Sequence, residues 1–224
     1  MNIRQEFYDE VRPHLASCLN RYLESYDKYV NVDGIRAHYA GLGGRASLRF
    51  YQWVRENRPQ VVVETGVCNG VSSYTLLKAM NMNGCGHLWS IDYPRYIGET
   101  VDGEVSCRRK PGKQLCAMVP RDWGVGWIVP QGLRDRWTLV LGDAREHLGP
   151  VLESAGEIDL FIHDSLHLEE HILWECRSVW PRMREGGLCA IDNARQNNAD
   201  HILSEEFNRK RIFIQGNRTI GFVK

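Results

Sequence analysis

The stretch that decides the fold runs from residue 61 to residue 70 and reads Val61-Val62-Val63-Glu64-Thr65-Gly66-Val67-Cys68-Asn69-Gly70. Its three consecutive valines form a continuous apolar run, which is typical of a strand that is buried on both faces of a parallel sheet. The glycines that follow allow a sharp turn and a close approach of the backbone to a ligand. A helical pattern comes next, at residues 71–80. The stretch therefore predicts a strand, a glycine-containing loop and a helix, which is the repeating unit of a doubly wound α/β fold.

Four further apolar runs repeat this pattern, and each ends beside an acidic residue. They are residues 88–91 before Asp92, 138–141 before Gly142-Asp143, 160–162 before His163-Asp164, and 188–191 before Asp192-Asn193. Helical patterns at residues 71–80, 144–154 and 166–183 separate most of the runs. Because strands alternate with helices, we expect a mostly parallel, doubly wound sheet. Residues 211–215 and 219–223 differ, since the short turn between them predicts an antiparallel hairpin at the C-terminus.

The segments outside this alternation predict a cap and an insertion. Residues 1–58 contain one helical pattern that extends to about residue 27 and a second at residues 46–57. Residues 59–224 are expected to form a Rossmann-like domain, in which residues 94–137 make an unusually long connection between two strands. We expect the helical cap and this domain to pack as one compact domain.

Composition excludes several classes of function. The 28 basic residues balance the 28 acidic residues, whereas nucleic-acid-binding domains are usually basic. No apolar run approaches the ~18 residues that a membrane span needs. The seven cysteines include no CxxC pair, and the N-terminus has no apolar leader, which favours reduced thiols in the cytoplasm. We expect a cytoplasmic protein that binds neither nucleic acid nor membranes, and the sequence leaves homo-oligomerisation open.

The acidic residues at the strand ends predict a ligand site. In an open parallel sheet, ligands bind beyond the carboxyl ends of the strands, where Glu64, Asp92, Asp143, Asp164 and Asp192 would all lie. Each carboxylate could instead cap the helix that follows it, although capping explains a single acid better than it explains acids at all five strand ends. A pyrophosphate beside Glu64 would place one anion against another, so a cationic or zwitterionic ligand fits better than a dinucleotide.

The ordered set of motifs resembles class I S-adenosylmethionine-dependent methyltransferases. The matching features are E-x-G-x-x-x-G at Glu64–Gly70, an acid at Asp92, Gly142-Asp143-Ala144, and the terminal hairpin. The resemblance covers about residues 61–224 and implies seven strands in the order 3-2-1-4-5-7-6, with strand seven antiparallel. The stretch from residue 158 to residue 167 further resembles a bacterial and archaeal branch that includes antibiotic sugar O-methyltransferases.

This resemblance suggests a place for each part of S-adenosylmethionine. Its amino-acid part would lie near Gly66, its ribose hydroxyls would donate to Asp92, and its adenine would lie near Asp143 and Ala144. His163 is expected to line the same pocket. The residues assigned to the cofactor are therefore Glu64, Thr65, Gly66, Asn69, Ser72, Asp92, Asp143, Ala144 and His163.

Asp164, Asp192 and Asn193 resemble the three Mg²⁺ ligands of catechol O-methyltransferase-like enzymes. All three offer oxygen, the ligand atom that a hard divalent ion prefers. Such an ion would lower the pKa of a substrate hydroxyl that is to be methylated. His167 stands where those enzymes carry a catalytic lysine, and its near-neutral pKa suits a general base. The alternative is that Asp164 caps a helix and that Asp192-Asn193 forms a turn.

Two other functions compete with this interpretation. A zinc hydrolase could use His167 and His171, since a helix that begins at about Ser165 would present both on one face. That hypothesis leaves Glu64, Gly66 and Asp92 unexplained. A non-catalytic protein that only binds S-adenosylmethionine is the second alternative. The favoured prediction is a methyltransferase that acts on a small-molecule hydroxyl, such as one on a sugar, a phenol or a natural product.

Overall fold

The computed structural model describes residues 2–26, 29–32, 35–38, 44–97 and 115–224. The middle of the predicted 94–137 insertion, residues 98–114, lies outside the described residues. So does the turn-rich stretch at residues 39–43, between the cap and its second helix.

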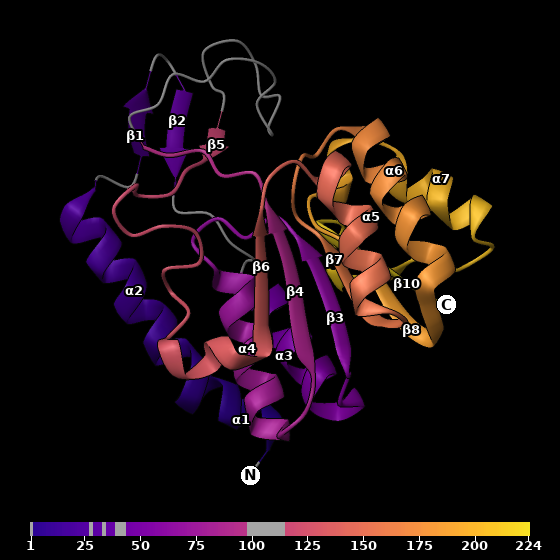
Figure 1. Ribbon diagram of the computed structural model, residues 1–224, viewed down its shortest axis with the longest axis horizontal. Coiled ribbons are helices and arrows are strands. Elements are labelled where there is room, and N and C mark those ends of the chain that lie inside the picture. The colour runs from indigo at the N-terminus through magenta and orange to yellow at the C-terminus, as the bar shows by residue number, and fades with distance from the viewer. Residues whose placement is uncertain (1, 27–28, 33–34, 39–43, 98–114) are drawn as a thin grey trace.

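A seven-stranded sheet forms the centre of the molecule (Figure 1). Its strands are β3 (Val61–Thr65), β4 (His87–Asp92), β6 (Trp137–Leu141), β7 (Ile158–His163), β8 (Met183–Ile191), β9 (Ile212–Gln215) and β10 (Thr219–Val223), in the spatial order β6-β4-β3-β7-β8-β10-β9. The first five strands in this order are parallel, and β10 is antiparallel to both β8 and β9. Numbered along the chain, the order is 3-2-1-4-5-7-6, so the expected fold class, strand order and terminal hairpin are confirmed.

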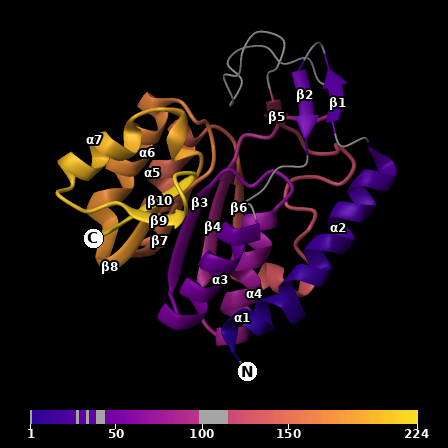
Figure 2. The same ribbon diagram turned by 180° about the vertical axis from the view of Figure 1, so that it is seen from behind.

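Helices cover both faces of the sheet, as Figures 1 and 2 show from opposite sides. One face carries α3 (Gly44–Asn57) and α4 (Val71–Asn83), and the other carries α5 (Ala144–Ala155), α6 (Glu169–Val179) and α7 (Ala199–Glu206). On β3, Val62 joins the apolar cluster under α3 and α4, whereas its neighbour Val63 joins the cluster under α5 and α6. Burial on both faces is the physical reason for the continuous apolar runs.

The N-terminal helices pack beside α3. The chain runs through α1 (Ile3–Glu6), one turn of π-helix (Phe7–Val11) and α2 (Arg12–Ser25). Pro13 lies in the first turn of α2, the part of a helix that tolerates a missing N–H group. The buried carboxylate of Glu6 accepts hydrogen bonds from Tyr51 and Arg55 of α3, and the Arg55 guanidinium holds the pKa of Glu6 below its usual range.

A second, three-stranded sheet was not predicted. β1 (Tyr29–Val32) and β2 (Ile35–His38) form an antiparallel pair, and β5 (Leu115–Ala117) adds to β2 in parallel. The first two strands belong to the predicted cap and the third to the predicted insertion. Figure 1 places this small sheet beyond the carboxyl ends of β3, β4 and β6. Cap and insertion are therefore physically joined on the side of the central sheet where a ligand would bind.

The predicted helix at residues 166–183 is wrong at both ends. The α-helix begins only at Glu169 and ends at Val179, a 3-10 turn spans Trp180–Arg182, and β8 starts at Met183. Two more 3-10 turns occupy Gln131–Arg136 and Ala194–Gln196. None of the helices in the described segments is long and apolar enough to cross a membrane.

Candidate functional site

The glycine loop after β3 joins the carboxyl ends of three neighbouring strands. The backbone N–H of Gly66 donates to the carbonyl of Ile91 on β4 (2.8 Å), and Gly66 also packs against the backbone of Asp164 after β7. Gly66 has φ +87° and Gly70 has φ +96°, values that favour glycine over residues with a Cβ atom. The loop thus places Glu64, Asp92 and Asp164 around one edge of the sheet.

Glu64 is a fully buried carboxylate with one unpartnered oxygen. Its Oε1 atom accepts hydrogen bonds from Ser73 and Ser90, while its Oε2 atom has no hydrogen-bond partner among the described residues. Burial raises the pKa of Glu64 to about 7, although hydrogen bonds from these serines and from the buried Ser72 oppose the shift. The group is therefore poised to hold a negative charge once a cationic partner arrives.

Asp92 holds the glycine loop with one oxygen and leaves the other free. Its Oδ1 atom accepts from the backbone N–H groups of Val67 (2.8 Å) and Cys68 (3.3 Å). Its Oδ2 atom is buried without a partner in the described part of the chain. Burial raises the pKa of Asp92, and the two backbone hydrogen bonds moderate the shift. A ligand hydroxyl could donate to Oδ2 without disturbing the loop.

Asp143 is the exposed N-cap of α5, because its Oδ1 atom accepts from the backbone N–H of Arg145 at 2.8 Å. The capping role that the sequence left open for the strand-end acids is thus present at this position. Ala144, beside it, is buried. Two neighbouring residues escaped the sequence analysis: Tyr93 is 71% exposed and Leu141 is 52% exposed, large apolar side chains at the ends of the paired strands β4 and β6.

Two more residues predicted to bind the cofactor are engaged by the protein itself. Asn69 is buried, and its Oδ1 atom accepts from the indole N–H of Trp127 at 2.6 Å. The Thr65 hydroxyl donates to Glu175 at 2.6 Å. The Asn69–Trp127 bond ties the glycine loop to the described end of the insertion, and the hydrogen bond from the Gly126 N–H to the Cys68 carbonyl (2.9 Å) reinforces it.

A buried Glu175 organises the histidines, and the sequence analysis missed it. Its carboxylate is hydrogen-bonded to Thr65, Ser165, His163 Nδ1 (2.6 Å) and His171 Nε2 (2.9 Å). Burial opposes ionisation of Glu175, but the two histidines and their hydrogen bonds hold its pKa well below the usual range. The four-residue spacing between His171 and Glu175 on α6 was the signal that could have identified this pair.

Two of the three residues predicted to bind a metal, Asp164 and Asn193, lie beside His167, and the third, Asp192, lies beside Asp164. The Asn193 amide nitrogen lies 2.9 Å from His167 Nε2, and the same ring nitrogen lies 3.7 Å from Asp164 Oδ1. Burial, followed by the neighbouring charge of Asp192, raises the pKa of Asp164 well above its usual range. Burial lowers the pKa of His167 to about 3, which keeps the ring neutral.

Asp192 already has partners within the protein. Its Oδ1 atom accepts from the Thr219 hydroxyl (2.7 Å), and its Oδ2 atom lies 3.3 Å from Arg218 Nη2. Both partners come from the terminal hairpin, which the sequence analysis treated only as a fold element. Arg218 therefore brings a positive charge to the acidic cluster.

The histidine pair of the zinc hypothesis does not form as predicted. His167 precedes α6, which begins at Glu169, so His167 and His171 do not share a helix face. His171 instead points to Glu175. Within the described residues, no cluster of three or more His, Cys, Asp or Glu side chains is arranged to hold a metal ion.

Buried polar atoms without a hydrogen-bond partner gather at this edge of the sheet. In the described part of the chain they include Glu64 Oε2, Asp92 Oδ2, His163 Nε2, His167 Nδ1 and Arg218 Nε. Because buried polar groups are normally satisfied, such a concentration indicates a place where a polar ligand binds.

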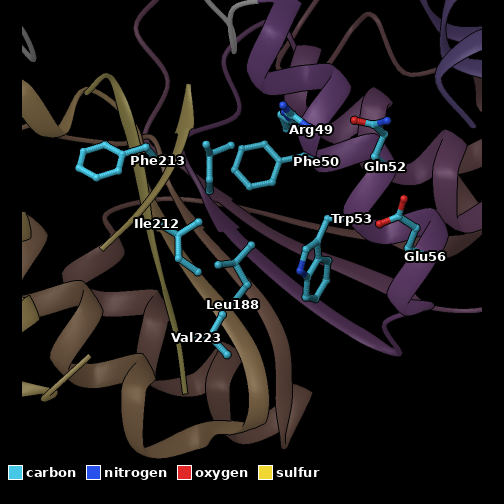
Figure 3. Close-up of a pocket in the computed structure, with 10 residues that line it drawn as sticks. Arg49, Phe50, Gln52, Trp53, Glu56, Leu188, Ile212, Phe213 and Val223 are labelled. Carbon is cyan, nitrogen blue, oxygen red and sulfur yellow. The ribbon is translucent and has the colours of Figure 1, made fainter. Parts of the chain in front are cut away.

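A pocket between α3 and strands β8, β9 and β10 is separate from the strand-end site. It has a volume of about 330 Å³, and Figure 3 shows Phe50 and Trp53 of α3 facing Leu188 and Ile212 of the sheet. None of its lining residues is a predicted site residue. The ligand site is therefore defined by the strand-end residues rather than by this pocket.

The sequence matches a protein family described as a methyltransferase domain over residues 63–194, more than half of the chain. The chain belongs to this family. The match confirms the resemblance to class I S-adenosylmethionine-dependent methyltransferases, and it spans the glycine loop and all three predicted metal ligands. Among curated protein sequences, none matches the methyltransferase.

Solved structures similar to the methyltransferase share its fold. A methyltransferase from Geobacter sulfurreducens aligns with a TM-score of 0.61 and 18% identity, covering 95% of this chain and 90% of that chain. The O-methyltransferase NovP aligns with a TM-score of 0.58 and 17% identity, covering 84% and 82% of the two chains. The structure named cmcI-D160 Mg-SAM aligns with a TM-score of 0.51 and 17% identity, covering 81% and 72%.

Proposed function

We propose that this methyltransferase transfers the methyl group of S-adenosylmethionine to a hydroxyl oxygen of a small molecule, with the help of a divalent ion, Mg²⁺. The observation that carries the proposal is that Asp164, which packs against the Gly66 loop, lies beside both Asp192 and His167, while Asn193 contacts His167 from the other strand end. Oxygen ligands and a general base, placed next to a methyl donor, are the groups that O-methylation needs.

The unpartnered oxygens support a placement for the cofactor. Glu64 Oε2 would receive the cationic ammonium group, and Asp92 Oδ2 would accept from the ribose hydroxyls. Gly66 allows the ligand to lie close to the backbone. The adenine would then lie near Asp143 and Ala144, with the exposed apolar side chains of Tyr93 and Leu141 as additional contacts.

The donor set is chemically suited to a divalent ion. The charge of Asp192 raises the cost of ionising Asp164, and a cation between them would relieve that repulsion. The Asn193 amide nitrogen faces His167, which leaves its oxygen available as a ligand. The structure named cmcI-D160 Mg-SAM is a fold relative whose name includes both Mg and the cofactor.

When bound, S-adenosylmethionine would supply an electrophilic methyl group and the ion would lower the pKa of the acceptor hydroxyl. The chemistry supplied would be transfer of this methyl group to the acceptor oxygen, with the electron pair of the broken carbon–sulfur bond left on sulfur. The acceptor proton passes to His167 Nε2, the nitrogen that faces Asp164 and Asn193. The buried His167 ring is neutral, and its lowered pKa makes it a weak base until an ionised Asp164, 3.7 Å from Nε2, stabilises the charged ring.

The small sheet and the described end of the insertion, residues 118–137, would form the side of the site where an acceptor binds. Trp123 and Trp127 lie edge to face, with ring centroids 4.5 Å apart, and the Arg21 guanidinium of α2 lies over both rings. Aromatic surfaces of this kind suit a sugar, a phenol or a related natural product. NovP, one of the similar structures, is named an O-methyltransferase.

A methyl-transfer assay with radiolabelled cofactor tests the proposal. Panels of sugars, phenols and glycosylated natural products would be incubated with the protein, first in excess chelator and then with MgCl₂ restored. We expect transfer to hydroxyl oxygen that is lost in chelator and restored by Mg²⁺, while calorimetry records cofactor binding in both conditions. Full turnover in excess chelator would remove the ion from the mechanism, and methylation of nitrogen or carbon instead of oxygen would overturn the acceptor class.

A further inference from the structure

Arg218 is a fixed cation at the edge of the acidic cluster. It lies in the turn between β9 and β10, where its N–H donates to the Gln215 carbonyl (3.1 Å) and its own carbonyl accepts from the Ala194 N–H (2.9 Å). These two bonds anchor its backbone to the hairpin and to the turn that contains Asn193. The side chain then reaches Asp192, with Nη2 3.3 Å from Oδ2.

The two charged groups of this pair differ in burial. Asp192 is fully buried, whereas the Arg218 side chain is 35% exposed. Asp164 lies beside Asp192, and Arg218 is the cation that lowers the cost of ionising Asp164. The buried Asp192 and the partly exposed Asp164 thus share one arginine. The Nε atom of that arginine is itself buried without a partner among the described residues, so the guanidinium has at least one hydrogen-bond donor to spare.

We propose that Arg218 is a tethered counter-ion that competes with the divalent ion for Asp192 and thereby sets the affinity of the site for that ion. The inference rests on the proposed function, since it concerns the same acidic cluster. Without the ion, Arg218 balances the charge of Asp192. When the ion binds, the guanidinium and the ion repel one another, and the partly exposed side chain of Arg218 turns toward solvent.

The size of the effect follows from Coulomb's law. A unit charge a few ångströms from a divalent ion changes the affinity of that ion by about tenfold even at the dielectric constant of water, and by more in a buried site. Loss of the Arg218 charge should therefore strengthen ion binding by about tenfold or more. A hydrogen-bonding role for Arg218 without charge competition predicts no such gain.

Binding of Mn²⁺ alone, measured from the loss of the free-ion signal in electron paramagnetic resonance, tests this directly. Arg218→Gln removes the charge but keeps a donor for Asp192, whereas Arg218→Lys keeps the charge. Arg209→Gln is the matched control, because Arg209 has the same charge and its guanidinium donates to the carbonyl of its neighbour Asn208, away from the acidic cluster. Combining Arg218→Gln with Asp164→Asn shows whether any gain arises at the acidic cluster. Circular dichroism confirms that each variant is folded.

We expect Arg218→Gln to bind Mn²⁺ about tenfold more tightly than the wild type, or better, because the competing charge is gone. Arg218→Lys and Arg209→Gln should remain near the wild type, and the gain should disappear with Asp164→Asn. Equal dissociation constants for wild type and Arg218→Gln would overturn the role of Arg218 while leaving the ion in place. Absence of Mn²⁺ binding in all variants at millimolar concentration would overturn this inference together with the ion of the proposed function. A gain that survives Asp164→Asn would also overturn the inference, because it would locate the ion elsewhere.

Discussion

Gly66 packs so closely against Asp164 that a Cβ atom added to Gly66 would lie 2.1 Å from the Asp164 carbonyl oxygen. The backbone of Gly66 also has a positive φ of +87°, which disfavours any residue with a side chain. The backbones of the glycine loop and of the first predicted metal ligand are therefore in direct contact.

Gly66→Ala should weaken binding of S-adenosylhomocysteine by about tenfold or more and lower the free energy of unfolding by about 1 to 3 kcal/mol, because the added methyl group overpacks the contact. Calorimetry and urea unfolding measure the two effects. Gly84→Ala is the control, since Gly84 has φ +71° but no atom within 4 Å of the position that a Cβ atom would occupy. Equal effects of the two substitutions would mean that the contact with Asp164 contributes neither to cofactor affinity nor to stability.

The buried Glu64 should make stability depend on pH. The unfolded chain ionises this carboxyl near its ordinary pKa of 4.5, whereas the folded, ligand-free protein keeps it protonated until a pH of about 7. The free energy of unfolding should therefore fall between these two values, by about 3 kcal/mol in total. Glu64→Gln should lack this decrease and be the more stable protein at about pH 8. Urea unfolding of both proteins at about pH 5 and pH 8 measures the difference, and parallel pH profiles would contradict the prediction.

Asp92→Asn should weaken cofactor binding without unfolding the protein. The asparagine oxygen can still accept from the Val67 N–H, but its amide nitrogen would face the ribose hydroxyls where Oδ2 now stands. We expect a loss of about 1 to 3 kcal/mol in binding free energy, measured by calorimetry with S-adenosylhomocysteine. Unchanged affinity in a folded variant would show that the ribose lies elsewhere.

His167→Ala should lower the turnover rate by a factor of about 10² to 10⁴ if His167 takes the acceptor proton, with cofactor affinity close to that of the wild type. The matched control is His201→Ala, because the His201 side chain is 61% exposed on α7. Single-turnover kinetics separates the chemical step from product release. A normal rate in the His167 variant would leave that residue a structural role in holding Asn193.

Binding of cofactor and acceptor should slow hydrogen exchange in residues 115–137, because Trp127 and Gly126 are bonded directly to the glycine loop. Residues 35–38 should slow together with them, since β2 pairs with β5. Exchange measured by mass spectrometry, with and without ligands, gives the comparison, and α7 at residues 199–206 is the internal reference. Equal protection in both states would indicate that these segments are fixed structure.

The elements that the sequence predicted well are those whose signal is local. Residues 61–70 carry their own apolar run and glycines, and the terminal hairpin carries its turn, so both follow from neighbouring residues alone. The strand order came from the family resemblance. The start of α6 was misplaced by three residues, from Leu166 to Glu169, because the residue at its N-cap, Leu168, has no side chain that can cap the helix and mark the boundary.

The parts of the site that could not be predicted depend on contacts between distant residues. Arg218 reaches Asp192 across 26 positions, and Glu175 meets Thr65 across 110 positions. Neither pairing leaves a periodic trace in the sequence. The small sheet escaped for the same reason, since strands of three or four residues are too short to establish a pattern.

The pairing of β2 with β5 also constrains how this enzyme could exchange parts with its relatives. The two strands come from segments on opposite sides of the first elements of the central domain, yet each supplies the hydrogen-bonding partner of the other. A chimaera that received either segment alone from another enzyme would leave one strand without a matching edge. Transplanting both segments as a single unit is therefore the exchange that keeps this sheet intact, whether by recombination or by protein engineering.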